Sequence, residues 1–129
     1  MDQNTSDALK QAALQASAAS YSPYSGYPVG AAVLTESGKI YQGTNVENAS
    51  YGATMCAERV AVFKAVSEGA RRILAIAVYS NGKKLPIPCG MCLQVLSEFA
   101  EDIPVLVSSA DDEKRFALSE LLPHRFGEQ

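Results

Sequence analysis

The spacing of hydrophobic and polar residues changes along this chain, and the changes predict helices that alternate with strands. Apolar residues recur at helical spacing over residues 5–20, where Thr5 or Ser6 can cap the start, and a run rich in proline and glycine then breaks the helix. Residues 73–79 form a nearly continuous apolar run, which is typical of a strand buried on both faces. The remaining predicted elements are strands at 29–35, 39–46, 103–107 and 115–118, helices at 56–68 and 90–100, and a helical turn at 119–122.

This alternation argues for a layered sheet with helices on its faces. The 129 residues suit one domain, predicted to span 1–129, and the sequence contains no linker or internal repeat. The net charge of −3 comes without a basic stripe, which argues against a nucleic-acid partner. No apolar stretch reaches the roughly 18 residues of a membrane span, and the polar start lacks the layout of a signal peptide, so no membrane partner is expected.

All three cysteines of the chain fall into one pattern, Cys56-Ala57-Glu58 followed by Pro88-Cys89-Gly90-Met91-Cys92. Cys56 and Cys89 are predicted at helix starts, where free N–H groups and a partial positive charge lower the pKa of a thiol. Cys92 lies one turn after Cys89 and therefore on the same helix face. We expect the three thiolates to converge on a zinc ion, whose open fourth position belongs to water, as in a catalytic site. Thiolate ligands and an odd cysteine count favour a reducing compartment, and we predict a cytoplasmic protein.

The residues around the cysteines allow several interpretations. Glu58, two residues after Cys56, can accept a proton from that water. Arg59 either faces the thiolates and offsets their excess negative charge or forms a surface salt bridge. The only histidine, His124, is expected at the surface or an interface instead of completing the metal site. A thioredoxin-like redox motif and a structural zinc site are the rival interpretations of the cluster, but the first needs neither the third cysteine nor Glu58, and the second would want a fourth protein ligand.

Taken together, the cysteine segments resemble those of cytidine deaminases of the small, three-cysteine kind. The likeness extends over roughly residues 21–126, including the segments 21–32, 45–51 and 120–126. It implies a three-layer αβα fold with a mixed five-stranded sheet, and one zinc ion per chain. It also implies hydrolytic deamination of cytidine and 2′-deoxycytidine in pyrimidine salvage, with Glu58 moving the protons. A cytosine-containing aminonucleoside antibiotic is the alternative substrate, although the segment Asn45-Val46-Glu47-Asn48 favours ordinary nucleosides. A polynucleotide-editing deaminase is disfavoured by the acidic charge balance.

The same resemblance assigns substrate-binding residues. Asn45 and Glu47 would hold the ribose 3′-hydroxyl, although both are also suited to capping a loop. Tyr27 stands where the family usually has phenylalanine and would pack against the pyrimidine ring, its alternative being a core aromatic beside a turn. Backbone groups of Ala57 and Cys89 are candidates for contacting the edge of the base.

The resemblance further implies a homotetramer in which neighbouring subunits complete the active sites. The candidate interface residues are aromatic: Tyr24, Tyr51 and Phe126. Two positions after Cys92 are also of interest. Leu93 stands where the family often has arginine, which removes one positive neighbour from the thiolates, and Gln94 is expected on the helix surface or behind the metal ligands.

Overall fold

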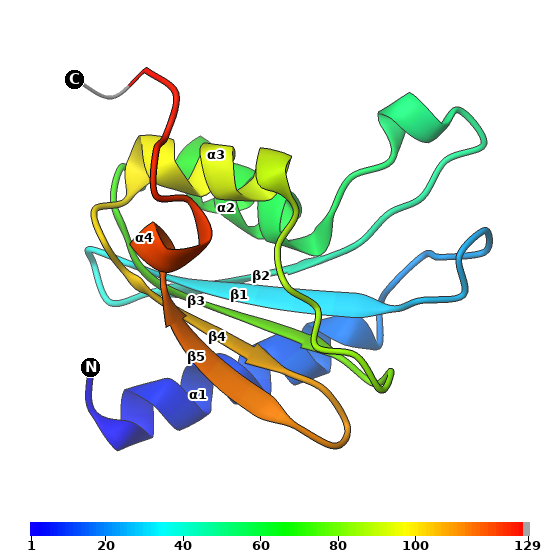
Figure 1. Ribbon diagram of the computed structural model, residues 1–129, viewed down its shortest axis with the longest axis horizontal. Coiled ribbons are helices and arrows are strands. Elements are labelled where there is room, and N and C mark those ends of the chain that lie inside the picture. Colours follow the sequence, from blue (N-terminus) through cyan, green and yellow to red (C-terminus); the bar gives the residue numbers. More distant parts are fainter. Residues whose placement is uncertain (128–129) are drawn as a thin grey trace.

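Five strands form one mixed sheet in the order β2-β1-β3-β4-β5 (Figure 1). The structure is a computed structural model that describes residues 1–127, so the last two residues of the predicted domain, 128 and 129, lie outside the described residues. The elements in chain order are α1 (Gln3–Ser17), β1 (Val29–Thr35), β2 (Ile40–Thr44), η1 (Tyr51–Ala53), α2 (Ala57–Ser67), β3 (Ile73–Ser80), α3 (Gly90–Phe99), β4 (Pro104–Ser108), β5 (Glu113–Ala117) and α4 (Leu118–Leu121).

The strand directions follow from the connections between them. β1 is antiparallel to both β2 and β3, and β4 is antiparallel to β5. β3 and β4 are parallel, which a tight turn cannot achieve, and α3 lies in the crossover that joins them. The result is a mixed sheet in which β3 is the central strand.

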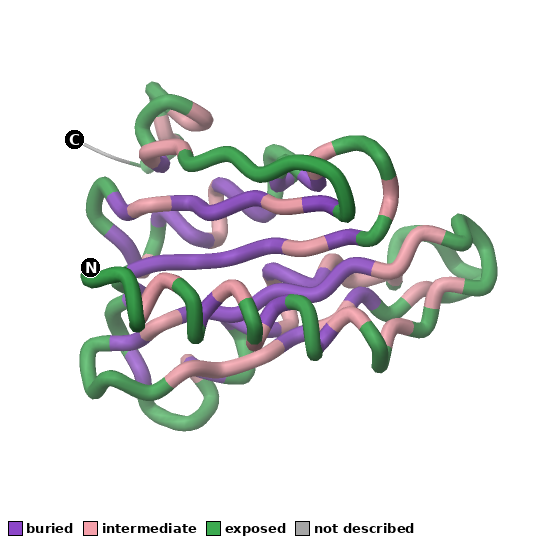
Figure 2. The backbone as a smooth tube through the Cα atoms, turned by 90° about the horizontal axis from the view of Figure 1, so that it is seen from below, coloured by how far each residue is buried: buried purple, intermediate pink, exposed green. Residues whose placement is uncertain are grey.

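Helices cover both faces of the sheet, α1 on one and α2 with α3 on the other (Figure 1), which confirms the predicted three-layer αβα architecture. Alternation along β3 divides its side chains between the two sides: Ala75 and Ala77 pack with α1, whereas the larger Ile76 and Val78 pack toward α2 and α3. The inner strands are buried along most of their length, as Figure 2 shows in purple. The nearly continuous apolar run at 73–79 is therefore explained by burial on both faces.

A close contact between β2 and α2 depends on a glycine. A Cβ atom built on Gly43 would lie 2.4 Å from the backbone nitrogen of Ala61 and 2.5 Å from the carbonyl oxygen of Ala57. Only a residue without a side chain allows backbone and backbone to approach this closely. Gly43 thereby sets the position of the first turn of α2 over the sheet.

The ends of several elements differ from the sequence prediction. Helix α1 begins at Gln3 because Asp2 caps it by accepting a hydrogen bond from the Thr5 N–H at 2.8 Å, so the expected caps Thr5 and Ser6 were wrong. It ends at Ser17 instead of residue 20, and the hydroxyl of Ser20 donates to Asn45 Oδ1. β5 begins two residues earlier than predicted because Glu113 pairs with Ser108 of β4.

The other bounds agree more closely. β1 matches the predicted 29–35, β3 extends one residue further than predicted, and α2 and α3 begin directly after Cys56 and Cys89. α4 begins at Leu118, one residue before the predicted turn, and the Glu120 carboxylate accepts a hydrogen bond from the Ala117 N–H at 2.7 Å. Within residues 1–127, no helix has the length and apolar character that a membrane crossing requires.

Candidate active site

Strand direction brings the starts of α2 and α3 together. Because β1 is antiparallel to both of its neighbours, β2 and β3 run in the same direction and end at the same edge of the sheet. The helix that follows each of these strands begins at that edge, with Cys56 as the N-cap of α2 and Cys89 as the N-cap of α3. Cys92 lies in the first turn of α3. Two segments far apart in the sequence therefore deliver their cysteines to one place.

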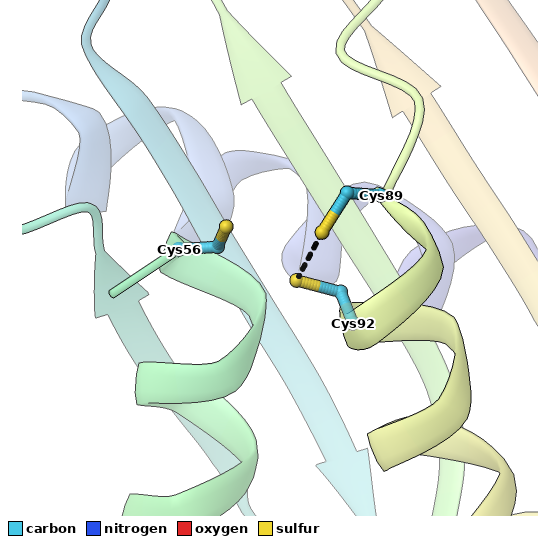
Figure 3. Close-up of side chains that lie close together, drawn as sticks. All are labelled: Cys56, Cys89 and Cys92. Atoms are coloured by element: carbon cyan, nitrogen blue, oxygen red, sulfur yellow. Dashed lines mark hydrogen bonds between the residues drawn. The ribbon is translucent and has the colours of Figure 1, made fainter. Parts of the chain in front are cut away.

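The three sulfur atoms gather at one place, where those of Cys89 and Cys92 point toward each other and that of Cys56 lies across from them (Figure 3). All three lie within 4.8 Å of one another, and the Sγ atoms of Cys89 and Cys92 are 3.5 Å apart. Zinc–sulfur bonds of about 2.3 Å in a tetrahedron place neighbouring sulfurs about 3.8 Å apart, so this cluster needs little adjustment to hold the ion. Soft thiolate donors also match the chemistry of zinc. No other residue in the described part of the chain extends the cluster, and His124 lies exposed near the C-terminus.

The cysteine cluster is polarised before any ion binds. A hydrogen bond from the Cys92 thiol lowers the pKa of Cys56 to about 5, and the Arg59 guanidinium assists. The same hydrogen bond, together with burial, raises the pKa of Cys92. Cys56 thus gives up its proton more readily than Cys92. A divalent cation favours the thiolate form, so metal binding here releases protons to solvent.

Arg59 lies on the sulfur side of α2. Its Nη2 atom is 3.4 Å from Cys56 Sγ, and this hydrogen bond raises the pKa of the Arg59 guanidinium. The Nε atom is buried and has no hydrogen-bond partner among residues 1–127. Of the two placements open from the sequence, the structure therefore has the one that faces the thiolates. Leu93 points elsewhere, because its side chain is 6% exposed and packs in the core beneath α2 and α3.

Glu58 is a buried carboxylate in the first turn of α2, with only 6% of its surface exposed. Burial raises the pKa of Glu58 to about 7, and the negative charge of Cys56 acts in the same direction. A group with this pKa exchanges its proton readily near neutral pH. A carboxylate of this kind beside a metal-binding cluster has the properties of a general acid and base.

A cavity of 320 Å³ opens in front of Cys56, Glu58 and Cys89. Its volume falls in the range of about 300–1,000 Å³ that is usual for small-molecule sites. A larger hollow of 570 Å³ lies between α1 and the β4–β5 turn, but no cysteine lines it. The cavity at the cysteines is lined by every predicted substrate-binding residue and by several others: Ser25, Tyr27, Val29, Asn45, Glu47, Thr54, Met55, Cys56, Ala57, Glu58, Pro86, Ile87 and Cys89.

Asn45 and Glu47 hold the segment that carries Tyr27. The Asn45 amide donates to the Tyr27 carbonyl at 2.9 Å and accepts from the Val29 N–H at 3.0 Å. The Glu47 carboxylate accepts from the N–H groups of Tyr24 and Ser25 at 2.9 and 3.1 Å. A further hydrogen bond, from the Ser25 hydroxyl, lowers the pKa of Glu47. Both residues therefore cap a loop, as one interpretation of the sequence allowed, while they also line the cavity.

Sequence reasoning did not identify several residues of the cavity wall. Ser25 lies inside the segment 21–32 that was singled out, and its hydrogen bond to a candidate carboxylate is a tertiary contact with no local signal. Pro86 and Ile87 come just before the Pro88-Cys89 pair, so their proximity to a ligand was the only available indication.

The candidate interface residues lie at two places on the surface. The rings of Tyr24 and Tyr51 meet edge to face with centroids 6.1 Å apart, on two segments that project from the body of the molecule (Figure 1). Phe126 is 88% exposed, yet its backbone is held by Gln94, whose amide donates to the Phe126 carbonyl at 3.1 Å and accepts from its N–H at 3.2 Å. Gln94 thus anchors the C-terminal segment, a role that the sequence did not indicate.

Comparisons with known proteins place this geometry in a family. The family model described as "Cytidine and deoxycytidylate deaminase zinc-binding region" matches residues 3–107. A cytidine deaminase of Halalkalibacterium halodurans is 47% identical over 120 residues, which cover 92% of this chain and 91% of the relative. The crystal structure of cytidine deaminase from Burkholderia pseudomallei superimposes with a TM-score of 0.89 at 40% identity, covering 98% of this chain and all of that one. A blasticidin-S deaminase of Bacillus cereus is less similar, with 32% identity over 106 residues.

Removal of one thiol tests the metal centre. We expect Cys89→Ala to lose stoichiometric zinc, because two thiolates and water hold the ion far more weakly than three, and to lose stability with it. Elemental analysis of the purified protein, alongside its melting temperature, measures both effects. Met91→Ala is the matched control, since Met91 is exposed between the two cysteines of α3 and should keep its zinc. One zinc per chain in Cys89→Ala would contradict the ligand assignment.

Proposed function

The chain belongs to the family of cytidine and deoxycytidylate deaminases, and from this premise we propose that its cavity binds a cytosine nucleoside and hydrolyses the 4-amino group. Cytidine and 2′-deoxycytidine give uridine and 2′-deoxyuridine, with release of ammonia. The observation that carries this proposal is the buried Glu58 beside three convergent cysteines, in a cavity of nucleoside-binding size. Residues 1–129 act as one deaminase domain.

Cys56, Cys89 and Cys92 hold one zinc ion per chain. When bound, zinc supplies Lewis-acid activation of a water molecule. Arg59 donates to the Cys56 sulfur and so withdraws negative charge from the ligand set, which offsets the surplus charge of three thiolates. Leu93 lies in the core and makes no such contribution. Arg59 and the partial positive charges of the two helix starts therefore offset the surplus negative charge of the thiolates.

Glu58 moves the protons of the reaction. In its ionised form a carboxylate oxygen accepts a proton from water, and in its neutral form it donates that proton to N3 of cytosine. The oxygen of that water would bond to C4, and Glu58 would then take the remaining proton from this oxygen and deliver it to the 4-amino group, which leaves as ammonia when the C4–N bond breaks. Burial suits Glu58 to this exchange because it raises the pKa to about 7, where both protonation states are populated.

The other residues of the cavity orient the nucleoside. Tyr27 packs its ring against the pyrimidine, and backbone groups of Ala57 and Cys89 contact the edge of the base. Asn45 and Glu47 bind the ribose 3′-hydroxyl: the amide has a second N–H besides the one that Tyr27 occupies, and the ionised carboxylate is an acceptor. The hydrogen bonds that these two residues make to residues 24–29 keep them in place before the sugar arrives.

The assembly and the cellular setting follow the same family. We propose a homotetramer in the cytoplasm that serves pyrimidine salvage, with Tyr24, Tyr51 and Phe126 at subunit interfaces. Exposed aromatic side chains on held backbones are suited to such contacts because they lose little conformational freedom on binding. The net charge of −3 does not favour nucleic acid as a partner.

A panel of substrates tests the function itself. We expect ultraviolet assays to show turnover of cytidine and 2′-deoxycytidine, and little turnover of free cytosine, because the latter makes no contact with Asn45 and Glu47. Blasticidin S is included as the alternative substrate. We expect it to be turned over less well than the nucleosides, because the chain is less similar to a blasticidin-S deaminase than to cytidine deaminases. Inertness toward both nucleosides in a preparation loaded with zinc would contradict the proposal.

Substitution of the buried carboxylate tests its role. Glu58→Gln should keep its zinc and its fold while turnover falls by about 10²–10⁴, the usual loss for a general acid and base. Glu68→Gln, at the exposed end of the same helix, is the matched control and should retain the parent rate. Zinc content and kcat are measured on the same samples. A rate within a fewfold of the parent would refute the assignment of Glu58.

Hydrodynamics tests the assembly. Sedimentation velocity at micromolar concentration should give the mass of four chains, and Tyr51→Ala should shift the distribution toward smaller species because it removes an exposed anchor. A monomer across the accessible concentration range would exclude the tetramer while leaving the zinc site and its chemistry open to the other tests.

A further inference from the structure

Gly82, in the connection between β3 and α3, lies against the ring of Tyr27. A Cβ atom at this position would be 3.0 Å from Cε1 and 3.7 Å from Cδ1 of Tyr27. Tyr27 lines the cavity at the cysteines, whereas Gly82 does not. The glycine therefore touches the proposed base-binding ring from outside the cavity.

Backbone conformation does not account for a glycine here. The glycines with positive φ are Gly26, Gly38, Gly69 and Gly127, and Gly82 is not among them. An alanine could adopt the same backbone angles without strain. A Cβ atom at this position would instead press on the Tyr27 ring, which would have to shift by a few tenths of an ångström.

The two segments that meet at this contact are tied together. Ser80 is fully buried at the end of β3, and its hydroxyl donates to the Pro28 carbonyl at 2.9 Å and accepts from the Gly82 N–H at 3.4 Å. Ser80 also pairs with Val29 in the sheet. The turn that carries Gly82 is therefore connected through the buried Ser80 to the segment that carries Tyr27.

The backbone of Tyr27 is held as well. Its N–H donates to the Ser25 hydroxyl at 3.0 Å, and its carbonyl accepts from the Asn45 amide at 2.9 Å. With the main chain of Tyr27 held and the turn connected to it through Ser80, the ring itself shifts if Gly82 gains a side chain. Because the ring borders the cavity, its displacement changes the space available to the base.

We propose that Gly82 is a positioning residue for the pyrimidine base, acting through the ring of Tyr27. Because Gly82 has no side chain, the Tyr27 ring can pack directly against the β3–α3 connection. The resulting position of the ring sets the width of the cavity where the base binds. This inference rests on the proposed function, since the effect is exerted on a bound cytosine nucleoside.

Gly82→Ala is the decisive variant. We expect the KM for cytidine and the Kd for uridine, measured by calorimetry, to rise by about fivefold or more, with kcat within about twofold of the parent. The Tyr27 ring contacts the bound substrate and the transition state equally. Loss of a contact that stabilises both states to the same extent raises KM and leaves kcat unchanged. Lys83→Ala, exposed in the same turn, is the matched control and should leave both constants unchanged.

A double-mutant cycle with Tyr27→Leu shows whether the effect passes through the ring. Leucine has no atom at the Cε1 position, so Gly82→Ala should cause no further change in KM or Kd in that background. If Gly82→Ala lowers the melting temperature of the parent, it should cause no further lowering in the Tyr27→Leu background, because the clashing atom is gone.

Three results would overturn the inference: unchanged constants in Gly82→Ala, an equal rise of the constants in both backgrounds, or an equal loss of stability in both backgrounds. The parent protein separates this failure from a broader one. If the zinc-loaded parent neither turns over cytidine nor binds uridine, the proposed function is wrong and the inference about Gly82 is wrong as well.

Discussion

The direction of three neighbouring strands is the constraint on which the site depends. β1 runs opposite to both β2 and β3, so the two outer strands of this trio end at one edge of the sheet and their helices begin there. Because Cys56 and Cys89 are the N-caps of these helices, the positions of the two helix starts determine where their sulfur atoms lie. Gly43 refines the arrangement, because its contact with Ala57 and Ala61 brings α2 down onto β2. The metal centre is thus built from the topology of the sheet and needs no long side chains to reach across it.

The part of the cavity wall that contains Asn45 and Glu47 is organised by hydrogen bonds between two loops. Asn45 and Glu47 bind backbone groups of residues 24–29, and in return those residues fix the side chains of Asn45 and Glu47. Such mutual support reduces the entropy that the loops would otherwise lose when substrate binds. The cysteine cluster is therefore built on helix starts, whereas the residues proposed to bind the nucleoside are held by paired loops.

Local patterns in the sequence were sufficient to predict much of this structure. The apolar run of β3 and the turn residues around β1 defined those strands closely, and the spacing of the cysteines with the helix periodicity predicted their convergence. The ends of α1 were wrong because Asp2 competes successfully as a cap and Ser20 is bound to Asn45, a partner 25 residues away. Contacts such as Gln94 with Phe126 and Gly82 with Tyr27 join segments distant in sequence, and no local periodicity reports them.

The C-terminal segment is tied to the helix that carries two of the three sulfurs. Arg125 donates to the Ser97 and Ala100 carbonyls at 2.8 and 3.1 Å, and Gln94 binds the backbone of Phe126. The two Arg125 bonds satisfy carbonyl groups that the end of a helix otherwise leaves to solvent. Fraying of the tail consequently exposes the end of α3, so the two should open as one cooperative unit in native-state hydrogen exchange. Residues far from the cysteines thereby stabilise the end of the helix whose first turn holds Cys92.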